Sequence, residues 1–307
     1  MTEFGKVAVM FGGNSAEREV SLMSGQAVLD GLLASGIDAY GFDPKEQSLN
    51  ELTTQRFDRV FNVLHGRGGE DGALQGALDF LKIPYTGSGV LGAALSMDKI
   101  KTKQVWLSLG LPTAKFGILD GLDGIDYQAL LDDLGGVIMV KPANEGSSIG
   151  MAKVDSVTEL KKAIDIAKSF DQDILLEQWI DGGEYTVAIL GDVALPAIHM
   201  TTPNDFYDYQ AKYQSNETQY HCPCGLSEED ESELRTIALK AFKAVNAKGW
   251  GRVDFMRGKD KQWYLLEVNT VPGMTKSSLV PKAAKQAGIE FNDLVKNILI
   301  QTLPVNG

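Results

Sequence analysis

Polar side chains interrupt two short strand-like segments near the C-terminus, residues 250–255 (WGRVDF) and 264–269 (YLLEVN). Alternation along a strand sends every second side chain to the same face, so Arg252 lies beside Asp254 and Glu267 beside Asn269. Burying two carboxylates and an amide among apolar residues is costly unless they hold a cation. Oxygen ligands of this kind suit Mg²⁺, which shares its coordination with waters and phosphates. The two segments therefore predict a site for MgATP.

A glycine-rich loop at residues 141–150 (KPANEGSSIG) joins two further predicted strands. Its small residues allow backbone N–H groups to approach an anion, and Lys141 adds a positive charge. The Walker A pattern is absent, and an ordinary glycine–serine turn is the alternative for this loop taken alone. Together with the carboxylates downstream, the loop indicates phosphate binding that involves Lys141 and Ser148.

The strand after this loop, and its continuation, offer groups for a nucleoside. A carboxylate commonly holds ribose hydroxyls, and Glu177 and Glu184 are candidates. An adenine ring needs apolar and aromatic walls, for which Trp179, Ile180 and Phe206 are candidates. The alternative for Trp179 is an ordinary place in the hydrophobic core.

Two glycine-containing loops near the N-terminus follow predicted strands. At residues 12–17 (GGNSAE) a strand leads into a helix, and Glu17 is either a helix-stabilising acid or a carboxylate for a substrate ammonium. The pattern GxGxxG is not met there. At residues 65–72 (HGRGGEDG) four polar side chains stand among four glycines, and ligands bind at such strand ends in parallel sheets. We therefore expect His65 near a site.

Composition limits the classes of partner. The chain has 307 residues and a net charge of −12, which argues against nucleic-acid binding. The first residues lack a signal-peptide pattern, and no apolar run approaches the roughly 18 residues of a membrane span. The two cysteines, Cys222 and Cys224, form no disulfide framework and fit a reducing cytoplasm. His221 beside them suggests zinc, but a second pair of ligands is missing nearby.

The predicted elements divide the chain into three units. Residues 1–95 alternate strands and helices, which predicts an α/β unit with a parallel sheet. Residues 96–181 read as an antiparallel α+β unit, and residues 182–307 as a third unit that contains a long polar loop at 201–225. Such a long loop is often a functional lid, which would bring Lys212 and Tyr213 to the phosphates. A solvated lysine is the alternative for Lys212.

The expected elements are as follows. Strands are predicted at 6–11, 39–42, 59–64, 83–85, 136–141, 151–154, 174–180, 185–190 and 194–200, besides the two segments above. Helices are predicted at 15–33, 72–81, 96–109, 157–169, 228–247, 282–287 and 292–303.

Taken together, these segments resemble the ATP-grasp enzymes, and within them the D-alanine–D-alanine ligase family. The resemblance covers essentially the whole chain and is carried by residues 11–21 (FGGNSAEREVS), 64–72 (LHGRGGEDG), 85–89 (YTGSG), 96–99 (SMDK), 141–150 (KPANEGSSIG), 206–213 (FYDYQAKY), 249–254 (GWGRVD) and 265–278 (LLEVNTVPGMTKSS). It implies an ATP-grasp fold with an N-terminal parallel-sheet domain. Each segment alone is weak evidence, and the set is highly specific.

The resemblance implies a reaction. ATP phosphorylates the carboxylate of one D-alanine, the amine of a second D-alanine attacks this acyl phosphate, and D-Ala-D-Ala, ADP and phosphate result, for peptidoglycan precursor synthesis. Two Mg²⁺ or Mn²⁺ ions would be held by Asp254, Glu267 and Asn269. Expected partners are D-alanine and ATP, without nucleic acid or membrane, and the family suggests a homodimer.

The resemblance also assigns roles to single residues. The phosphate cations are Lys99, Lys141 and Lys212, and the adenosine contacts are Glu177, Trp179, Ile180 and Glu184. Glu17 holds the first ammonium and Ser278 the second carboxylate, while Arg252 and the Gly273 N–H stabilise the oxyanion. Ser147 and Tyr213 join Glu17 in a hydrogen-bonded trio, and His65 biases the second site toward an amine.

Three alternatives stay open on the sequence. A related ATP-grasp ligase could use D-lactate or D-serine as its second substrate, although the Lys212–Tyr213 pair looks like the peptide-forming kind. An oxidoreductase could be built on the N-terminal unit, against which the missing GxGxxG speaks. A noncatalytic nucleotide-binding scaffold is the third.

Overall fold

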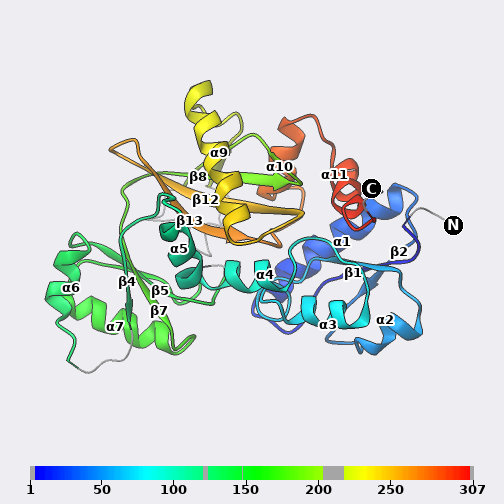
Figure 1. Cartoon of the computed structure of the whole chain (residues 1–307), viewed down its shortest axis with the longest axis horizontal. Coiled ribbons are helices and arrows are strands. Elements are labelled where there is room, and N and C mark those ends of the chain that lie inside the picture. Colours follow the sequence, from blue (N-terminus) through cyan, green and yellow to red (C-terminus); the bar gives the residue numbers. More distant parts are fainter. Residues whose placement is uncertain (1–3, 120–123, 147, 203–217, 305–307) are drawn as a thin grey trace.

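Three separate β-sheets organise the protein. The computed structural model describes residues 4–119, 124–146, 148–202 and 218–304. Within them lie a three-stranded, a four-stranded and a six-stranded sheet. Figure 1 shows the three-stranded sheet at one end, the four-stranded sheet at the other and the six-stranded sheet between and above them. We call the sheets with their helices the N-terminal, central and C-terminal units. The boundaries predicted after residues 95 and 181 stay predictions.

The N-terminal unit has the parallel sheet that its alternating pattern predicts. Its strands run in the order β2-β1-β3, and both pairs are parallel. The strands are β1 (Val7–Met10), β2 (Ala39–Phe42) and β3 (Arg59–Asn62), and the helices are α1 (Arg18–Ala34), α2 (Asn50–Thr54) and α3 (Ala73–Leu81). All four residues of β1 are apolar and buried, whereas β3 buries Arg59 and Asn62 together with Val60 and Phe61.

The strand predicted at residues 83–85 is wrong. Only a single bridge joins Tyr85 to Val60. The Val60 N–H donates to the Pro84 carbonyl, and the Thr86 N–H donates to the Val60 carbonyl. Because Pro84 has no N–H, it cannot donate the next hydrogen bond of a ladder with β3, and Gly87 then turns the chain with a φ of 90°.

The helix predicted at residues 96–109 is also wrong in its start. Two helices occupy this region, α4 (Val90–Met97) and α5 (Lys99–Ser108). Asp98 between them has an extended backbone, and its side chain accepts a hydrogen bond from the Lys101 N–H. This N-cap satisfies a free donor of the new helix and so begins α5 at Lys99.

The central unit has the antiparallel sheet expected for an α+β unit. Its strand order is β4-β7-β5-β6, and every pair is antiparallel. The strands are β4 (Phe116–Leu119), β5 (Ile138–Pro142), β6 (Ala152–Val154) and β7 (Ile174–Gln178), with helices α6 (Tyr127–Asp133) and α7 (Val157–Lys168). Both helices share a buried core with the sheet. The sequence pattern did not reveal β4 or α6.

The C-terminal unit carries the two polar strands. The path through its sheet is β11-β10-β8-β12-β13, with β9 paired to β8. The strands are β8 (Gly182–Leu190), β9 (Val193–Ala194), β10 (Ile198–Thr201), β11 (Gln219–His221), β12 (Trp250–Gly258) and β13 (Trp263–Asn269), and the helices are α9 (Glu228–Ala244), α10 (Leu279–Gln286) and α11 (Phe291–Ile300). The loop predicted at 201–225 is shorter, because β11 pairs with β10 inside it.

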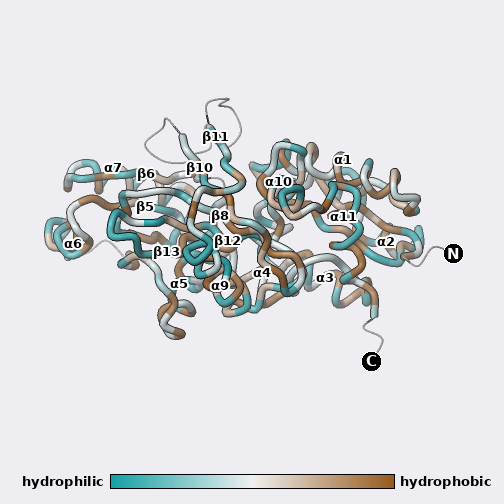
Figure 2. Tube along the Cα trace, turned by 90° about the horizontal axis from the view of Figure 1, so that it is seen from above, coloured by the Kyte–Doolittle hydropathy of each residue, from teal (hydrophilic) through white to brown (hydrophobic). Residues whose placement is uncertain are grey.

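One buried core joins the N-terminal and C-terminal units. Val28 and Leu32 of α1 belong to the same apolar cluster as Leu294 and Leu299 of α11. Figures 1 and 2 both show α11 close to α1 and far from α6 and α7. The two polar strands are thereby fixed relative to the N-terminal loops. Among the described residues, no helix is both long and apolar enough to span a membrane.

Candidate active site

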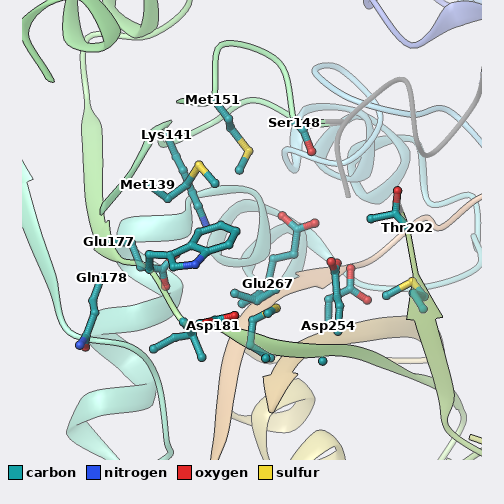
Figure 3. A pocket seen from close by; sticks show the side chains of 18 of the residues that line it. Met139, Lys141, Ser148, Met151, Glu177, Gln178, Asp181, Thr202, Asp254 and Glu267 are labelled. Atoms are coloured by element: carbon teal, nitrogen blue, oxygen red, sulfur yellow. The ribbon is translucent and has the colours of Figure 1, made fainter. Parts of the chain in front are cut away.

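A cavity of about 330 Å³ lies between the central and C-terminal sheets. Figure 3 shows Lys141 and Glu177 on its central-unit side and Asp254 and Glu267 on its C-terminal side. The predicted site residues that line it are Lys99, Lys141, Ser148, Glu177, Trp179, Ile180, Glu184, Asp254 and Glu267. The cavity thus combines cations, carboxylates and apolar walls, which are the groups a nucleotide requires.

The two polar strands bring their functional groups to one face. Asp254 pairs with Glu267 across the antiparallel strands, and Arg252 pairs with Asn269. The register then shifts, because Phe255 pairs with Leu265 and Leu266 is left as a bulge. Carboxylates directly opposite each other repel, so this arrangement favours a cation between them.

Asp254 is held by four hydrogen bonds. Arg252 donates from Nε to Oδ1 and from Nη2 to Oδ2, both at 2.7 Å. Asn269 Nδ2 donates to Oδ2 at 3.0 Å. Thr186 Oγ1 donates to Oδ1 at 2.6 Å. Thr186 lies opposite Asp254 on β8, and no local motif in the sequence could have revealed it.

The donor set fits Mg²⁺ or Mn²⁺ only with help from the substrate. No three His, Cys, Asp or Glu residues gather to hold a metal ion within the described part of the chain. Two carboxylates and the Asn269 amide oxygen remain as ligands, and Mg²⁺ commonly completes its octahedron with waters and phosphate oxygens. Lys99 Nζ lies 3.7 Å from Glu267 Oε2, which places a cation at the same end of the cavity.

Lysines and apolar groups occupy the central-unit side. Lys141 Nζ contacts Glu177 Oε2 at 2.5 Å, and Lys99 Nζ donates to the Glu145 carbonyl at 2.5 Å. Lys153 Nζ lies 4.3 Å from the centre of the Trp179 ring. Trp179 is partly exposed and lines the cavity, so it is not an ordinary core residue.

A second cluster lies where the N-terminal loops meet the glycine-rich loop. A Cβ atom added to Gly66 or to Gly146 would stand 2.8 Å from Glu17 Oε2, so this carboxylate sits between the two loops. Glu17 is the N-cap position of α1, yet its side chain makes no cap hydrogen bond. Glu17 is therefore not a hydrogen-bonding cap of α1, although its charge at this helix N-terminus still interacts favourably with the macrodipole.

Glu70 belongs to the same cluster, although the sequence pattern did not single it out as a site residue. Its Oε2 accepts from the Gly66 N–H at 2.5 Å. Burial raises the pKa of Glu70 to about 8, and the negative charge of Glu17 adds to the shift. Two carboxylates that perturb each other are typical of functional sites. The available signal was the carboxylate within the HGRGGEDG loop itself.

The turn that carries Gly273 packs against His65 and Ser24 of the N-terminal unit. Ser24 Oγ lies 3.4 Å from His65 Nε2 and accepts from the Met274 N–H at 3.0 Å. Burial lowers the pKa of His65 to about 4, and the charge of Arg252 contributes, so the imidazole is neutral at pH 7.

Ser278 closes the other side of this turn. Its Oγ accepts from the Thr275 N–H at 3.0 Å and would lie 3.0 Å from a Cβ at Gly273. Gly273 and Ser278 are therefore neighbours, as the predicted roles require. The remaining predicted residues lie outside the described part of the chain, and their roles stay predictions: Ser147, Phe206, Lys212 and Tyr213.

Comparisons with known proteins cover nearly the whole chain. The family described as D-ala D-ala ligase C-terminus matches residues 105–300, and D-ala D-ala ligase N-terminus matches residues 39–88. A D-alanine–D-alanine ligase of Idiomarina loihiensis is 59% identical over 302 residues, which are 98% of each chain.

Solved structures agree with these matches. A D-alanine–D-alanine ligase of Bacillus anthracis has a TM-score of 0.86 at 32% identity, with 97% of both chains covered. A D-alanine–D-alanine ligase of Bacillus anthracis described as complexed with ATP has a TM-score of 0.84 at 29% identity, again over 97% of both chains. The chain therefore belongs to the D-alanine–D-alanine ligase family and has its ATP-grasp fold.

Proposed function

We propose that this chain joins two D-alanine molecules into D-Ala-D-Ala at the expense of ATP, for peptidoglycan precursor synthesis. The observation that carries the proposal is the opposition of Asp254 and Glu267 in a cavity that also holds Lys99 and Lys141. Opposed carboxylates with nearby lysines suit a nucleotide bound through divalent ions. Membership of the ligase family supports the choice of D-alanine.

ATP occupies the cavity between the central and C-terminal sheets in this proposal. The phosphates lie near Lys99, Lys141 and Ser148, while adenosine packs against Trp179 and Ile180. Glu177 and Glu184 face the same cavity and serve the polar edges of the nucleoside. The relative that was crystallised with ATP supports nucleotide binding by this fold.

Asp254, Glu267 and Asn269 would hold two Mg²⁺ or Mn²⁺ ions. Such ions neutralise charge on the β- and γ-phosphates during phosphoryl transfer. Arg252 and Thr186 fix the Asp254 carboxylate by hydrogen bonds, so it keeps one orientation through the reaction.

The amino acids lie toward the N-terminal unit. Glu17 holds the ammonium of the first D-alanine, whose carboxylate oxygen bonds to the γ-phosphorus as the bond from that phosphorus to ADP breaks. Ser278 holds the carboxylate of the second D-alanine. Its amine, after losing a proton, attacks the acyl carbon, and phosphate leaves.

Arg252 and the Gly273 N–H stabilise the oxyanion that forms in this attack. The fork to Asp254 uses two of the five N–H groups of the guanidinium. Preorganised donors of this kind lower the barrier most when charge develops next to them. The neutral His65 next to the Gly273 turn avoids repelling the protonated amine before it reacts.

Phosphate release tests the proposal. We expect release from MgATP with D-alanine and none with L-alanine or without an amino acid, and a dipeptide mass in the product. D-lactate and D-serine offered in competition identify the second substrate. Tight ATP binding without release in the presence of D-alanine would contradict the proposed reaction.

We propose further that the chain works in the cytoplasm as a homodimer. The free thiols of Cys222 and Cys224 suit a reducing compartment. Phe80 at the end of α3 is 89% exposed, and Val90 and Leu91 of the adjoining α4 are exposed as well. Light scattering tests the dimer, which Phe80→Glu should dissociate.

A further inference from the structure

Lys103 of α5 is a cation with no solvent exposure. Its side chain is 0% exposed and forms an ion pair with Glu177 Oε1. Its Nζ also donates to Thr113 Oγ1 at 2.6 Å and to the Leu265 carbonyl at 3.1 Å. A fully buried lysine is rare unless it is paired, so the burial of Lys103 with these partners calls for a structural or functional explanation.

The contacts of Lys103 join both walls of the cavity. Glu177 belongs to β7 of the central sheet, while the Leu265 carbonyl belongs to β13 of the C-terminal sheet. Leu265 lies beside the bulge at Leu266 and two residues before Glu267. Lys103 itself is absent from the cavity lining, whereas Glu177 and Lys141 both belong to it (Figure 3).

Glu177 therefore lies between two lysines. Lys103 pairs with Oε1, and Lys141 pairs with Oε2 at 2.5 Å. Two positive charges and one negative charge leave the group with a net charge of +1. If Lys103 were neutral, Glu177 and Lys141 would cancel, and the wall would present no net charge to a phosphate.

We propose that Lys103 is a positioning residue for nucleotide binding, which holds Glu177 in place and offsets its charge so that Lys141 keeps a positive charge for the nucleotide. The inference rests on the proposed function, because it assumes that ATP fills this cavity. Lys103 acts through Glu177 and Lys141 and touches no substrate.

The pKa of Glu177 is consistent with this arrangement. Burial alone would raise it, but the charges of Lys103 and then Lys141 outweigh burial and hold the pKa below its ordinary value. Glu177 is therefore ionised at neutral pH and needs a compensating cation. Burial lowers the pKa of Lys103, and the charge of Glu177 opposes that shift.

A purely structural role is the competing explanation. Lys103 could serve only to fill space under α5 and to satisfy the Leu265 carbonyl. Removal of the Lys103 ammonium would then weaken ATP binding by the same factor whether or not residue 177 carries a charge. The two explanations therefore differ in the coupling between Lys103 and Glu177, which a double-mutant cycle measures.

The experiment compares ATP dissociation constants, measured by calorimetry with Mg²⁺, for four chains: unsubstituted, Lys103→Met, Glu177→Gln and the double variant. We expect Lys103→Met to weaken binding at least about tenfold when Glu177 is present and less than about twofold in the Glu177→Gln background. Lys103→Gln, which keeps an N–H donor for Leu265, replaces Lys103→Met if the latter does not fold.

Lys115→Met is the matched control. Lys115 pairs with Asp133 at 2.6 Å in the same unit, but both side chains are more than half exposed. Its removal should leave ATP binding unchanged. Equal losses of ATP affinity from Lys103→Met in both backgrounds would overturn this inference and leave the proposed function unaffected. Failure of the unsubstituted chain to bind ATP would overturn the proposed function and the inference with it.

Discussion

The hydroxyl of Ser24 accepts a hydrogen bond from the Met274 N–H at 3.0 Å, although the two residues are 250 positions apart. Ser24 lies on α1, and Met274 follows Gly273, whose N–H we propose as an oxyanion donor. Both residues are fully buried. The bond therefore fixes the oxyanion turn of one unit against a helix of another.

Removing this hydroxyl should impair turnover more than binding. In Ser24→Ala the Met274 N–H loses its acceptor, and an unsatisfied buried donor costs about 1–3 kcal/mol. The turn can then move, so the Gly273 N–H is no longer held in place. We expect kcat to fall about tenfold while the KM for ATP stays within about twofold.

Ser35→Ala is the control for this prediction. Ser35 is an exposed residue at the other end of α1, and its hydroxyl donates to the Gly31 carbonyl. A decrease in kcat of equal size in both variants would argue for loss of α1 stability rather than for loss of the turn. Full activity of Ser24→Ala would contradict the proposal that the Ser24–Met274 hydrogen bond holds the Gly273 N–H in place.

Parts of the site that follow from local pattern could be predicted from the sequence. Period-two alternation placed Arg252 beside Asp254, and the structure shows their bidentate ion pair. The alternating strands and helices of the first 95 residues correctly indicated a parallel sheet. These features depend on neighbours in the chain, which a single sequence displays.

Residues whose partners lie on other elements could not be predicted. Thr186, Lys103 and Ser24 stand in ordinary strand or helix segments, and only tertiary packing brings them to Asp254, Glu177 and Met274. The break between α4 and α5 was missed because one capping side chain, Asp98, outweighed a continuous helical pattern.

Glu267→Gln should abolish most metal-dependent turnover. The substitution removes one of two opposed carboxylates and the partner that Lys99 has at 3.7 Å. We expect kcat to fall by about 100-fold, in line with the several kcal/mol that bound divalent ions contribute. Titration of Mg²⁺ in steady-state assays measures the effect.

A second readout separates metal binding from catalysis. Ligand that binds only the folded state raises its melting temperature. The unsubstituted chain should melt higher with MgATP than with ATP and a chelator, and Glu267→Gln should lose this difference. A variant that keeps both the Mg²⁺ dependence and the thermal shift would contradict the ligand role of Glu267.

Glu70 should make the protein less stable as the pH rises. Burial raises its folded pKa from 4.5 to about 8, so between these values the unfolded chain releases a proton that the folded chain keeps. The unfolded state then binds fewer protons, and the free energy of unfolding decreases with pH. Glu70→Gln should therefore be the more stable chain at about pH 8 and nearly equal at about pH 5.

His65 supplies an internal check on this experiment. Its folded pKa is depressed from 6.5 to about 4, so its contribution to stability is lost as the pH falls through that range. Glu70→Gln should leave this acid-side loss in place and flatten only the alkaline side. Melting curves that shift equally at every pH would show that the Glu70 carboxyl does not titrate as described.

The ion pair between Arg67 and Glu145 connects the N-terminal unit with the glycine-rich loop. Arg67 Nε lies 2.9 Å from Glu145 Oε1, and the Glu145 carbonyl accepts from Lys99. Because the Arg67 side chain is 54% exposed, we expect Arg67→Gln and Glu145→Gln to change stability by less than about 1 kcal/mol. Each should nevertheless raise the KM for ATP about fivefold, since the phosphate loop loses its anchor.

A double-mutant cycle distinguishes this anchor from two independent effects. The double variant should have the KM of either single variant, because the second substitution breaks a contact that is already lost. Lys115 and Asp133 form a matched surface pair, with Lys115 equally exposed at 54% and no link to the loop. Their substitution should leave the KM for ATP unchanged. If the increases in the KM for ATP from the Arg67 and Glu145 substitutions were additive, each residue would act on the nucleotide separately.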